Sequence, residues 1–270
     1  MPPHQRPITP PAALTSSPPA ADDAPPATAP PLSPAERDAV DRALAMYREG
    51  WFPMAQSRRD RRAEWVQPRE RCLIPLDPAH FHVSGTLRAR VRSGRFVITT
   101  DRAFPDVIRA CAHTTDHPQR DETWINLGIE RLFTLLHRAG HAHSVEAWLV
   151  PASLPAPATP GTAQSPVLVG GLYGLALGRV FCGESMFSRP ALGGTDASKA
   201  CLVHLVHHLR RRGFAALDAQ LENPHLTQFG ARLTPMDEYG ALLRAHAGTE
   251  HETPWLPWEP ERTIEELVSA

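Results

Sequence analysis

Hydrophobic residues recur every three or four positions in four segments of the chain, a period typical of helices with one buried face. The first segment follows Ser33-Pro34-Ala35-Glu36, which predicts a capping box with proline in the first helical turn. This helix is expected to end near Arg48, before Gly50. The predicted helices cover residues 33–48, 104–112, 127–139 and 197–212.

Shorter apolar runs lie between these helices and predict strands. The predicted strands cover residues 94–100, 143–150, 166–174, 177–183 and 214–221. Because strands interleave with helices and some strands follow one another directly, the pattern favours an α/β protein with a mixed sheet over a sandwich or a helical bundle.

Three segments do not fit this pattern. Residues 1–32 are rich in proline and alanine and predict a disordered tail, and residues 151–165 predict a flexible insertion. Residues 250–270, with Trp255 and Trp258, are expected to form a C-terminal tail over the surface.

Composition narrows the function only slightly. A net charge of -1 indicates neither a strongly basic nucleic-acid-binding protein nor an acidic disordered chain. The four cysteines are widely spaced without a CxxC pair, which favours free thiols in a reducing compartment. No apolar run approaches the length of about 20 residues needed to span a bilayer, so a cytoplasmic location without membrane contact is expected.

Two polar positions stand out in apolar surroundings. Alternation along a strand would place Asp218 and Gln220 side by side on one face, where a carboxylate and an amide need hydrogen-bond partners. Glu184 follows Gly183 at the end of another predicted strand, where a carboxylate could hold a substrate ammonium group. Alternatively, Asp218 and Gln220 would only form hydrogen bonds with backbone groups of a nearby loop. Glu184 would then lie in a solvent-exposed turn without a functional role.

The spacing of histidines and arginines bears on metal and nucleic-acid binding. His141 and His143 lie two residues apart without a third ligand at helical spacing, so no metal site is predicted. Arginines interleaved with tryptophans are typical of a surface that contacts phosphates and stacks a base, although such runs also occur on ordinary solvated faces. This candidate surface contains Trp51, Arg58, Arg59, Arg61, Arg62, Trp65, Arg69 and Arg71.

A set of short motifs resembles the leucyl/phenylalanyl-tRNA–protein transferase family. In order, the motifs are TWI at 123–125, GHAHSVE at 140–146, GGLYG at 170–174, FCGESMFS at 181–188, ASK at 197–199 and DAQ at 218–220. The match runs from about residue 38 to 245 and includes Gly50-Trp-Phe-Pro53, similar to the family's GxFP. Met54 departs from the aromatic residue found in many relatives.

The resemblance implies a small N-terminal α/β domain at 33–70 and a domain similar to the GCN5-related acetyltransferases at 71–249. It implies transfer of Leu or Phe, and less readily Met, from aminoacyl-tRNA to proteins with N-terminal Arg or Lys, which are thereby marked for degradation. No cofactor is implied, because the aminoacyl ester is already activated.

The resemblance also implies roles for individual residues. Asp218 would orient or help deprotonate the attacking amine, directly or through Gln220, and Glu184 would hold the amino group of the transferred residue. Trp124 would stack near the terminal adenosine, and Trp65 and Arg71 would contact the tRNA. The side chain of the transferred residue would enter an apolar pocket formed by Leu172, Phe181, Met186, Leu202 and Leu205.

Two other functions remain open at this point. A coenzyme A-dependent N-acetyltransferase would require a glycine-rich pyrophosphate loop, which residues 188–195 do not match. A catalytically inactive module that binds tRNA or N-terminal degrons is the other alternative.

Overall fold

The computed structural model describes residues 30–113, 123–150, 165–248, 255, 258 and 260–269. Most of the predicted tail and of the predicted insertion therefore lies outside the described residues. The helices are α1 (Pro34–Arg48), α2 (Gly85–Arg92), α3 (Phe104–Ala112), α4 (Leu127–Arg138), α5 (Ala197–Arg211), α6 (Pro224–Thr227), α7 (Met236–His246) and α8 (Pro260–Ser269), with a 3-10 turn η2 at Pro190–Leu192.

The strands form two sheets. They are β1 (Phe52–Met54), β2 (Glu64–Val66), β3 (Glu70–Ile74), β4 (Val97–Thr100), β5 (Ala142–Leu149), β6 (Val167–Leu177), β7 (Val180–Ser188), β8 (Ala216–Asp218) and β9 (Arg232–Pro235). β1 and β2 form a small antiparallel sheet, and the other seven form a sheet in the order β4-β5-β6-β7-β8-β3-β9. Within the larger sheet only β7 and β8 run parallel, so the predicted mixed-sheet α/β class is confirmed.

The four predicted helices are confirmed, because their start and stop signals are local. Ser33 accepts a hydrogen bond from the Glu36 amide at 3.3 Å, and Glu36 accepts one from the Ser33 amide at 2.7 Å, which closes the capping box before α1. Asn126 caps α4 in the same manner by accepting from the Ile129 amide at 2.9 Å.

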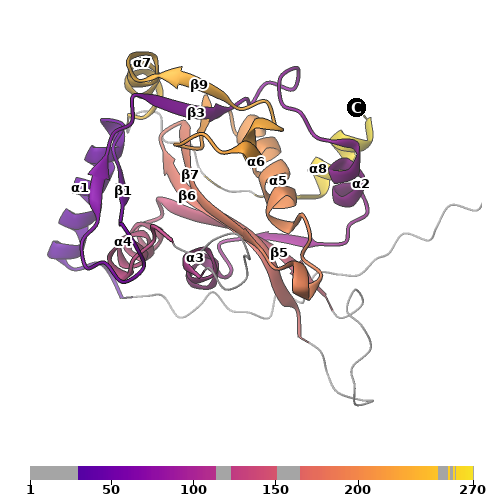
Figure 1. The fold of residues 1–270 in the computed structure, drawn as a ribbon, viewed down its shortest axis with the longest axis horizontal. Helices are drawn as coiled ribbons and strands as arrows, with labels where there is room; N and C mark the ends of the chain where they lie inside the picture. Colours follow the sequence, from indigo (N-terminus) through magenta and orange to yellow (C-terminus); the bar gives the residue numbers. More distant parts are fainter. Residues whose placement is uncertain are drawn as a thin grey trace, which may run out of the picture. The chain divides into compact units, whose positions relative to one another are not determined.

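Helices cover both faces of the large sheet (Figure 1). On one face α1, α3 and α4 bury an apolar cluster that includes Tyr47, Phe133 and Tyr173. On the other face α2, α5 and α8 bury a second cluster with Leu172, Phe181 and Trp255. Both faces of the sheet are therefore covered by packed side chains, and a site is expected where two neighbouring strands separate.

Three sequence-based expectations are corrected. The strand predicted at 214–221 ends at Asp218, because Gln220 has a φ of +64°, which a strand does not allow. The strand predicted at 177–183 runs from Val180 to Ser188, so Glu184 lies within it. Trp255 was expected over the surface, but it is buried and stacks on Phe181 with ring centroids 5.2 Å apart.

The domain boundary predicted near residue 70 stays a prediction. It coincides with the change from the small sheet to β3, yet Tyr47 and Phe52 belong to the same apolar cluster as α3 and α4. No helix among the described residues is long and apolar enough to cross a membrane.

Candidate active site

A β-bulge in β7 places Glu184. Tyr173 of β6 pairs with Ser185, but the next residue, Gly174, pairs with Gly183, so Glu184 is the extra residue. A bulge bends the strand and redirects the side chain at that point. Glycine is required at 174, since a Cβ atom there would lie 2.4 Å from the Cys182 carbonyl oxygen.

The neighbouring strand β8 ends where β7 bulges. The parallel pairing of β7 with β8 covers only Val180–Cys182 and Ala216–Asp218, and the strands then separate. Across this gap the Gln220 Nε2 donates to Glu184 Oε1 at 2.7 Å, and the Tyr47 hydroxyl donates to the same oxygen at 2.7 Å. Three segments distant in sequence therefore meet at one carboxylate.

Asp218 lies behind this pair. Its carboxylate is 0% exposed and forms an ion pair with Arg71. It also accepts hydrogen bonds from the Tyr239 hydroxyl at 2.7 Å and from the Gln220 amide N–H at 2.8 Å. The predicted arrangement of Asp218 and Gln220 side by side on one strand face is therefore wrong. The backbone bond between them instead holds the turn that directs Gln220 towards Glu184.

Arg71 has no access to tRNA, so its predicted contact is wrong. It is 1% exposed, and it donates to the Gly50 carbonyl at 2.8 Å in addition to its ion pair with Asp218. Its guanidinium also lies over the Phe52 and Tyr239 rings, 4.8 and 4.7 Å from their centroids. Although burial by itself lowers the pKa of Arg71, the adjacent Asp218 carboxylate raises it above its ordinary value.

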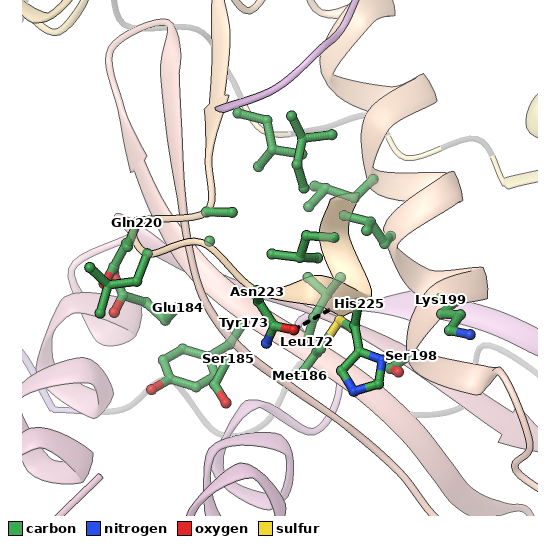
Figure 2. A pocket seen from close by; sticks show the side chains of 18 of the residues that line it. Leu172, Tyr173, Glu184, Ser185, Met186, Ser198, Lys199, Gln220, Asn223 and His225 are labelled. Carbon is green, nitrogen blue, oxygen red and sulfur yellow. Dashed lines mark hydrogen bonds between the residues drawn. The ribbon is translucent and has the colours of Figure 1, made fainter. Parts of the chain in front are cut away.

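A cavity of about 710 Å³ lies in front of Glu184 and Gln220 (Figure 2). Its apolar part is formed mainly by side chains of β6, β7, β8 and α5. These are Leu172, Met186, Leu202, Leu205 and Leu217. Four of the five predicted pocket residues are therefore brought together. Phe181 is not among the lining residues: it is buried against Trp255, and its predicted contact with the transferred side chain is wrong.

The rest of the cavity wall combines aromatic and polar side chains. Trp124, Phe52 and Met54 line it, as do Tyr173 and Ser185. Trp124 therefore lines the cavity, and its stacking on the terminal adenosine stays a prediction. Trp65 is half-buried and contacts Tyr47 edge-on at a centroid distance of 6.0 Å, but it does not line the cavity. Its tRNA contact stays a prediction.

Burial determines the protonation of Glu184. Removal from water raises its pKa from 4.5 to about 7, although the hydrogen bonds from Tyr47 and Gln220 act in the opposite direction. The pKa of Tyr47 is raised well above 10 by burial and by Glu184, so the phenol remains the donor in their hydrogen bond. A proton can therefore be gained or lost at Glu184 near neutral pH.

No group of three His, Cys, Asp or Glu side chains that could hold a metal ion occurs among the described residues. His143, one of the two histidines considered above, has a ring nitrogen 2.8 Å from Asp101 Oδ2 and stacks on Trp255 at 4.4 Å. These contacts indicate a structural role for His143.

Comparison with known proteins identifies the family. The family model for leucyl/phenylalanyl-tRNA protein transferase matches residues 75–244. The chain belongs to this family. A relative named leucyl/phenylalanyl-tRNA–protein transferase from Paramagnetospirillum magneticum is 50% identical over 216 residues, which cover 80% of this chain and 91% of the relative. A relative of the same name from Hyphomonas neptunium is 44% identical over 219 residues, covering 78% and 76%.

Membership makes the chain a transferase. A more distant likeness, to the crystal structure of FemX, has a TM-score of 0.48 at 12% identity, over 73% of this chain and 66% of that chain.

Sequence reasoning missed three hydroxyl groups at this site. Tyr47 lies in the first predicted helix, and Tyr173 and Ser185 lie in the GGLYG and FCGESMFS motifs, but none of the three was predicted to contribute to the site. A buried tyrosine usually finds a partner for its hydroxyl, and this was the available signal for Tyr47.

Proposed function

We propose that the chain moves Leu or Phe, and less readily Met, from aminoacyl-tRNA to the N-terminal Arg or Lys of acceptor proteins. The observation that carries this proposal is the cavity itself, in which an apolar compartment of leucine and methionine side chains adjoins the Glu184–Gln220 pair. An aminoacyl group carries an apolar side chain, an amino group and an ester on adjacent atoms, and this cavity has a surface suited to each.

The apolar compartment supports the choice of amino acid. Leu172, Met186 and Leu205 offer contacts for an unbranched or γ-branched apolar side chain and no partner for a charge. An apolar pocket distinguishes side chains that differ by one methylene by only about 1–3 kcal/mol, so overlapping use of Leu, Phe and Met is expected.

The polar pair supports the chemistry. The acceptor amine attacks the ester carbonyl, a C–N bond forms, the C–O bond to the terminal ribose breaks, and the amine proton ends on the ribose hydroxyl. An α-amine has a pKa of roughly 8 and must be neutral to attack. Because Gln220 Nε2 donates to Glu184, the side-chain carbonyl oxygen of Gln220 is the atom that accepts a hydrogen bond from the acceptor amine.

Asp218 is a positioning residue in this proposal. Its carboxylate does not line the cavity, but it fixes the Gln220 backbone through the 2.8 Å bond from the amide N–H. Of the two routes considered from sequence, action through Gln220 is therefore the one that we propose.

The tRNA is proposed to approach the aromatic side of the cavity. Trp124 offers a ring for the terminal adenosine, and Met54 offers sulfur and methyl contacts where an aromatic side chain would stack. Exposed Arg59, Arg61 and Arg62 lie in the segment between β1 and β2 and are available to phosphates. Charged tRNA and degradation of the modified acceptors would place the reaction in the cytoplasm.

The decisive experiment uses purified protein, tRNA charged with radiolabelled leucine, and a model protein that begins with Arg. Label should appear on that protein and not on a matched version that begins with Gly. Absence of transfer with Leu, Phe and Met donors would contradict the proposal, and binding of coenzyme A would then be measured to test the acetyltransferase alternative.

A further inference from the structure

Three buried oxygen atoms beside the cavity have no hydrogen-bond partner in the described part of the chain. They are Glu184 Oε2, Ser185 Oγ and the Tyr173 hydroxyl. A buried polar atom without a partner costs about 1–3 kcal/mol, so three in one place require an explanation. All three residues line the cavity, which makes a bound ligand group the natural partner.

The fold brings these three groups to the same region. Tyr173 and Ser185 are directly opposite each other on β6 and β7, so their side chains share one face of the sheet. In a regular strand Glu184 would point to the other face, but the bulge leaves it unpaired and redirects it. The charge of Glu184 is also among the causes that raise the pKa of Tyr173, which places the two groups near each other.

Figure 2 separates these groups from the rest of the cavity. Glu184, Tyr173 and Ser185 lie in the left half of the view with Gln220, whereas Met186, Ser198 and Lys199 lie in the right half. The carboxylate already uses Oε1 for two donors, Tyr47 and Gln220, so a further donor would have to come to Oε2.

We propose that Tyr173 and Ser185, together with Glu184 Oε2, form a subsite for the amino group of the amino acid carried by the donor tRNA. An ammonium group has three N–H donors, and the subsite has three unpartnered oxygen atoms, one of them on a carboxylate. The inference rests on the proposed function, because it takes the role proposed for Glu184 and adds two positioning hydroxyls to it.

The short distance between the side chain and the amino group of the donor amino acid favours the donor amino group, rather than the acceptor amine, as the ligand of this subsite. The side chain, the amino group and the ester of the donor share one Cα atom, so a side chain in the apolar compartment holds the amino group close by. The acceptor amine has to reach the ester carbonyl, where Gln220 is proposed to receive it. With the donor side chain held in the apolar compartment, Ser185 and Tyr173 would hold the amino group and so fix the rotation of the aminoacyl group about its Cα–Cβ bond. This orients the ester for attack.

The test compares two donors that differ only at this group. Phe-tRNA is treated with nitrous acid, which converts the amino group into a hydroxyl and leaves the ester and side chain unchanged. The ratio of kcat/KM for the two donors is measured for the wild type, Tyr173→Phe, Ser185→Ala and the double variant. Ser93→Ala removes an exposed hydroxyl that donates to the Arg90 carbonyl at the end of α2, and serves as the matched control.

Each single variant should lose roughly tenfold to a hundredfold in kcat/KM with Phe-tRNA, since hydrogen bonds to charged groups are the strong ones. With the deaminated donor the loss should be about threefold or less, because a hydroxyl offers one donor rather than three. Equal losses with both donors would overturn the inference, as would no loss with either.

Binding separates this inference from the proposed function. The affinities of Phe-tRNA and deaminated Phe-tRNA are measured without an acceptor protein, so the comparison does not depend on transfer. If the wild type fails to transfer but prefers Phe-tRNA through Tyr173 and Ser185, the proposed function fails and the subsite stands. If transfer occurs and neither hydroxyl affects the preference, the proposed function stands and the subsite is rejected.

Discussion

Two carboxylates on adjacent strands, the buried Asp218 and the half-buried Glu184, differ in how many of their oxygen atoms are hydrogen-bonded. Asp218 is satisfied on both oxygens by Arg71, Tyr239 and the Gln220 amide. Glu184 receives both of its donors on one oxygen, and its other oxygen has no partner among the described residues. A carboxylate whose oxygen atoms are all hydrogen-bonded to protein groups stabilises the fold. A carboxylate with one oxygen atom that lacks a protein partner can bind a ligand through that atom. Gln220 connects the two, through its backbone to Asp218 and its side chain to Glu184.

The largest effect is expected for Asp218→Ala, which leaves the Arg71 guanidinium buried without its partner. Removing one member of a buried ion pair costs about 3–5 kcal/mol, so the free energy of unfolding in urea should fall by that amount. Transfer should be lost as well, because the Gln220 turn loses its anchor, while tRNA binding is retained. Transfer at the wild-type rate would contradict the role given to Asp218.

A double variant separates stability from positioning at this centre. Arg71→Met combined with Asp218→Leu replaces the ion pair by apolar side chains, and such replacements are often neutral or stabilising. Most of the lost free energy of unfolding should return, but transfer should remain low. Recovery of both together would show that Asp218 contributes only stability.

Glu184→Gln should produce the converse result. The substitution removes a partly satisfied buried charge and keeps the size of the side chain, so the free energy of unfolding should be unchanged or slightly higher. Transfer should fall roughly tenfold to a hundredfold, because the donor's amino group loses a charged partner. Unchanged kinetics would remove the role proposed for Glu184.

The dependence of transfer on pH follows from the pKa of Glu184 of about 7. The ionised form is the one that can hold an ammonium group, so protonation of Glu184 should add a decrease in kcat/KM of about tenfold per pH unit below pH 7 to the decrease caused by protonation of the acceptor amine. Glu184→Gln should lack this limb and retain only the limb due to the acceptor amine near pH 8. A wild-type profile identical to that of the variant would contradict the assignment.

The effect on stability has the opposite sign. Because the pKa of Glu184 is higher in the folded chain than its ordinary value of 4.5, the folded state binds the proton more tightly. Its contribution to the free energy of unfolding is therefore present below pH 4.5 and lost as the pH rises towards 7. Thermal unfolding of the wild type relative to Glu184→Gln across this range measures the contribution.

The smallest effect is expected for Tyr47→Phe, which removes one of the two donors to Glu184 Oε1. Tyr47 acts on the substrate only through Glu184, whose ionised fraction at pH 7 should become smaller, so transfer should fall only severalfold at that pH. The hydrogen bond from Tyr47 lowers the pKa of Glu184, and its removal should move the acidic limb of the pH profile to higher pH. A limb that moves to lower pH, or does not move, would contradict this arrangement.

Local signals were sufficient for much of the fold. The capping box of Ser33 and Glu36 and the spacing of Ile129, Phe133 and Leu136 lie within a few residues of one another, so they could be interpreted without knowledge of the rest of the chain. The motifs around Glu184 and Gln220 likewise identified the family before any contact was known, because they are short and contiguous.

The failed predictions share a different origin. Arg71 was assigned to the surface by the charge of its segment, but its partner Asp218 is 147 residues away. Alternation along a continuous strand could not place Gln220, because the strand ends at Asp218 and the backbone turns at a positive φ. Phe181 was predicted to line the apolar pocket, but it is buried against Trp255 from the C-terminal segment.

The sequence by itself determined the helices, the mixed-sheet class, the family and the identity of the polar residues, since each depends on spacing or short contiguous motifs. Only the tertiary structure decided which carboxylate is satisfied and which remains available. That difference depends on a bulge between two strands and on partners from α1, β3 and α7, whose approach is determined by packing of the whole chain.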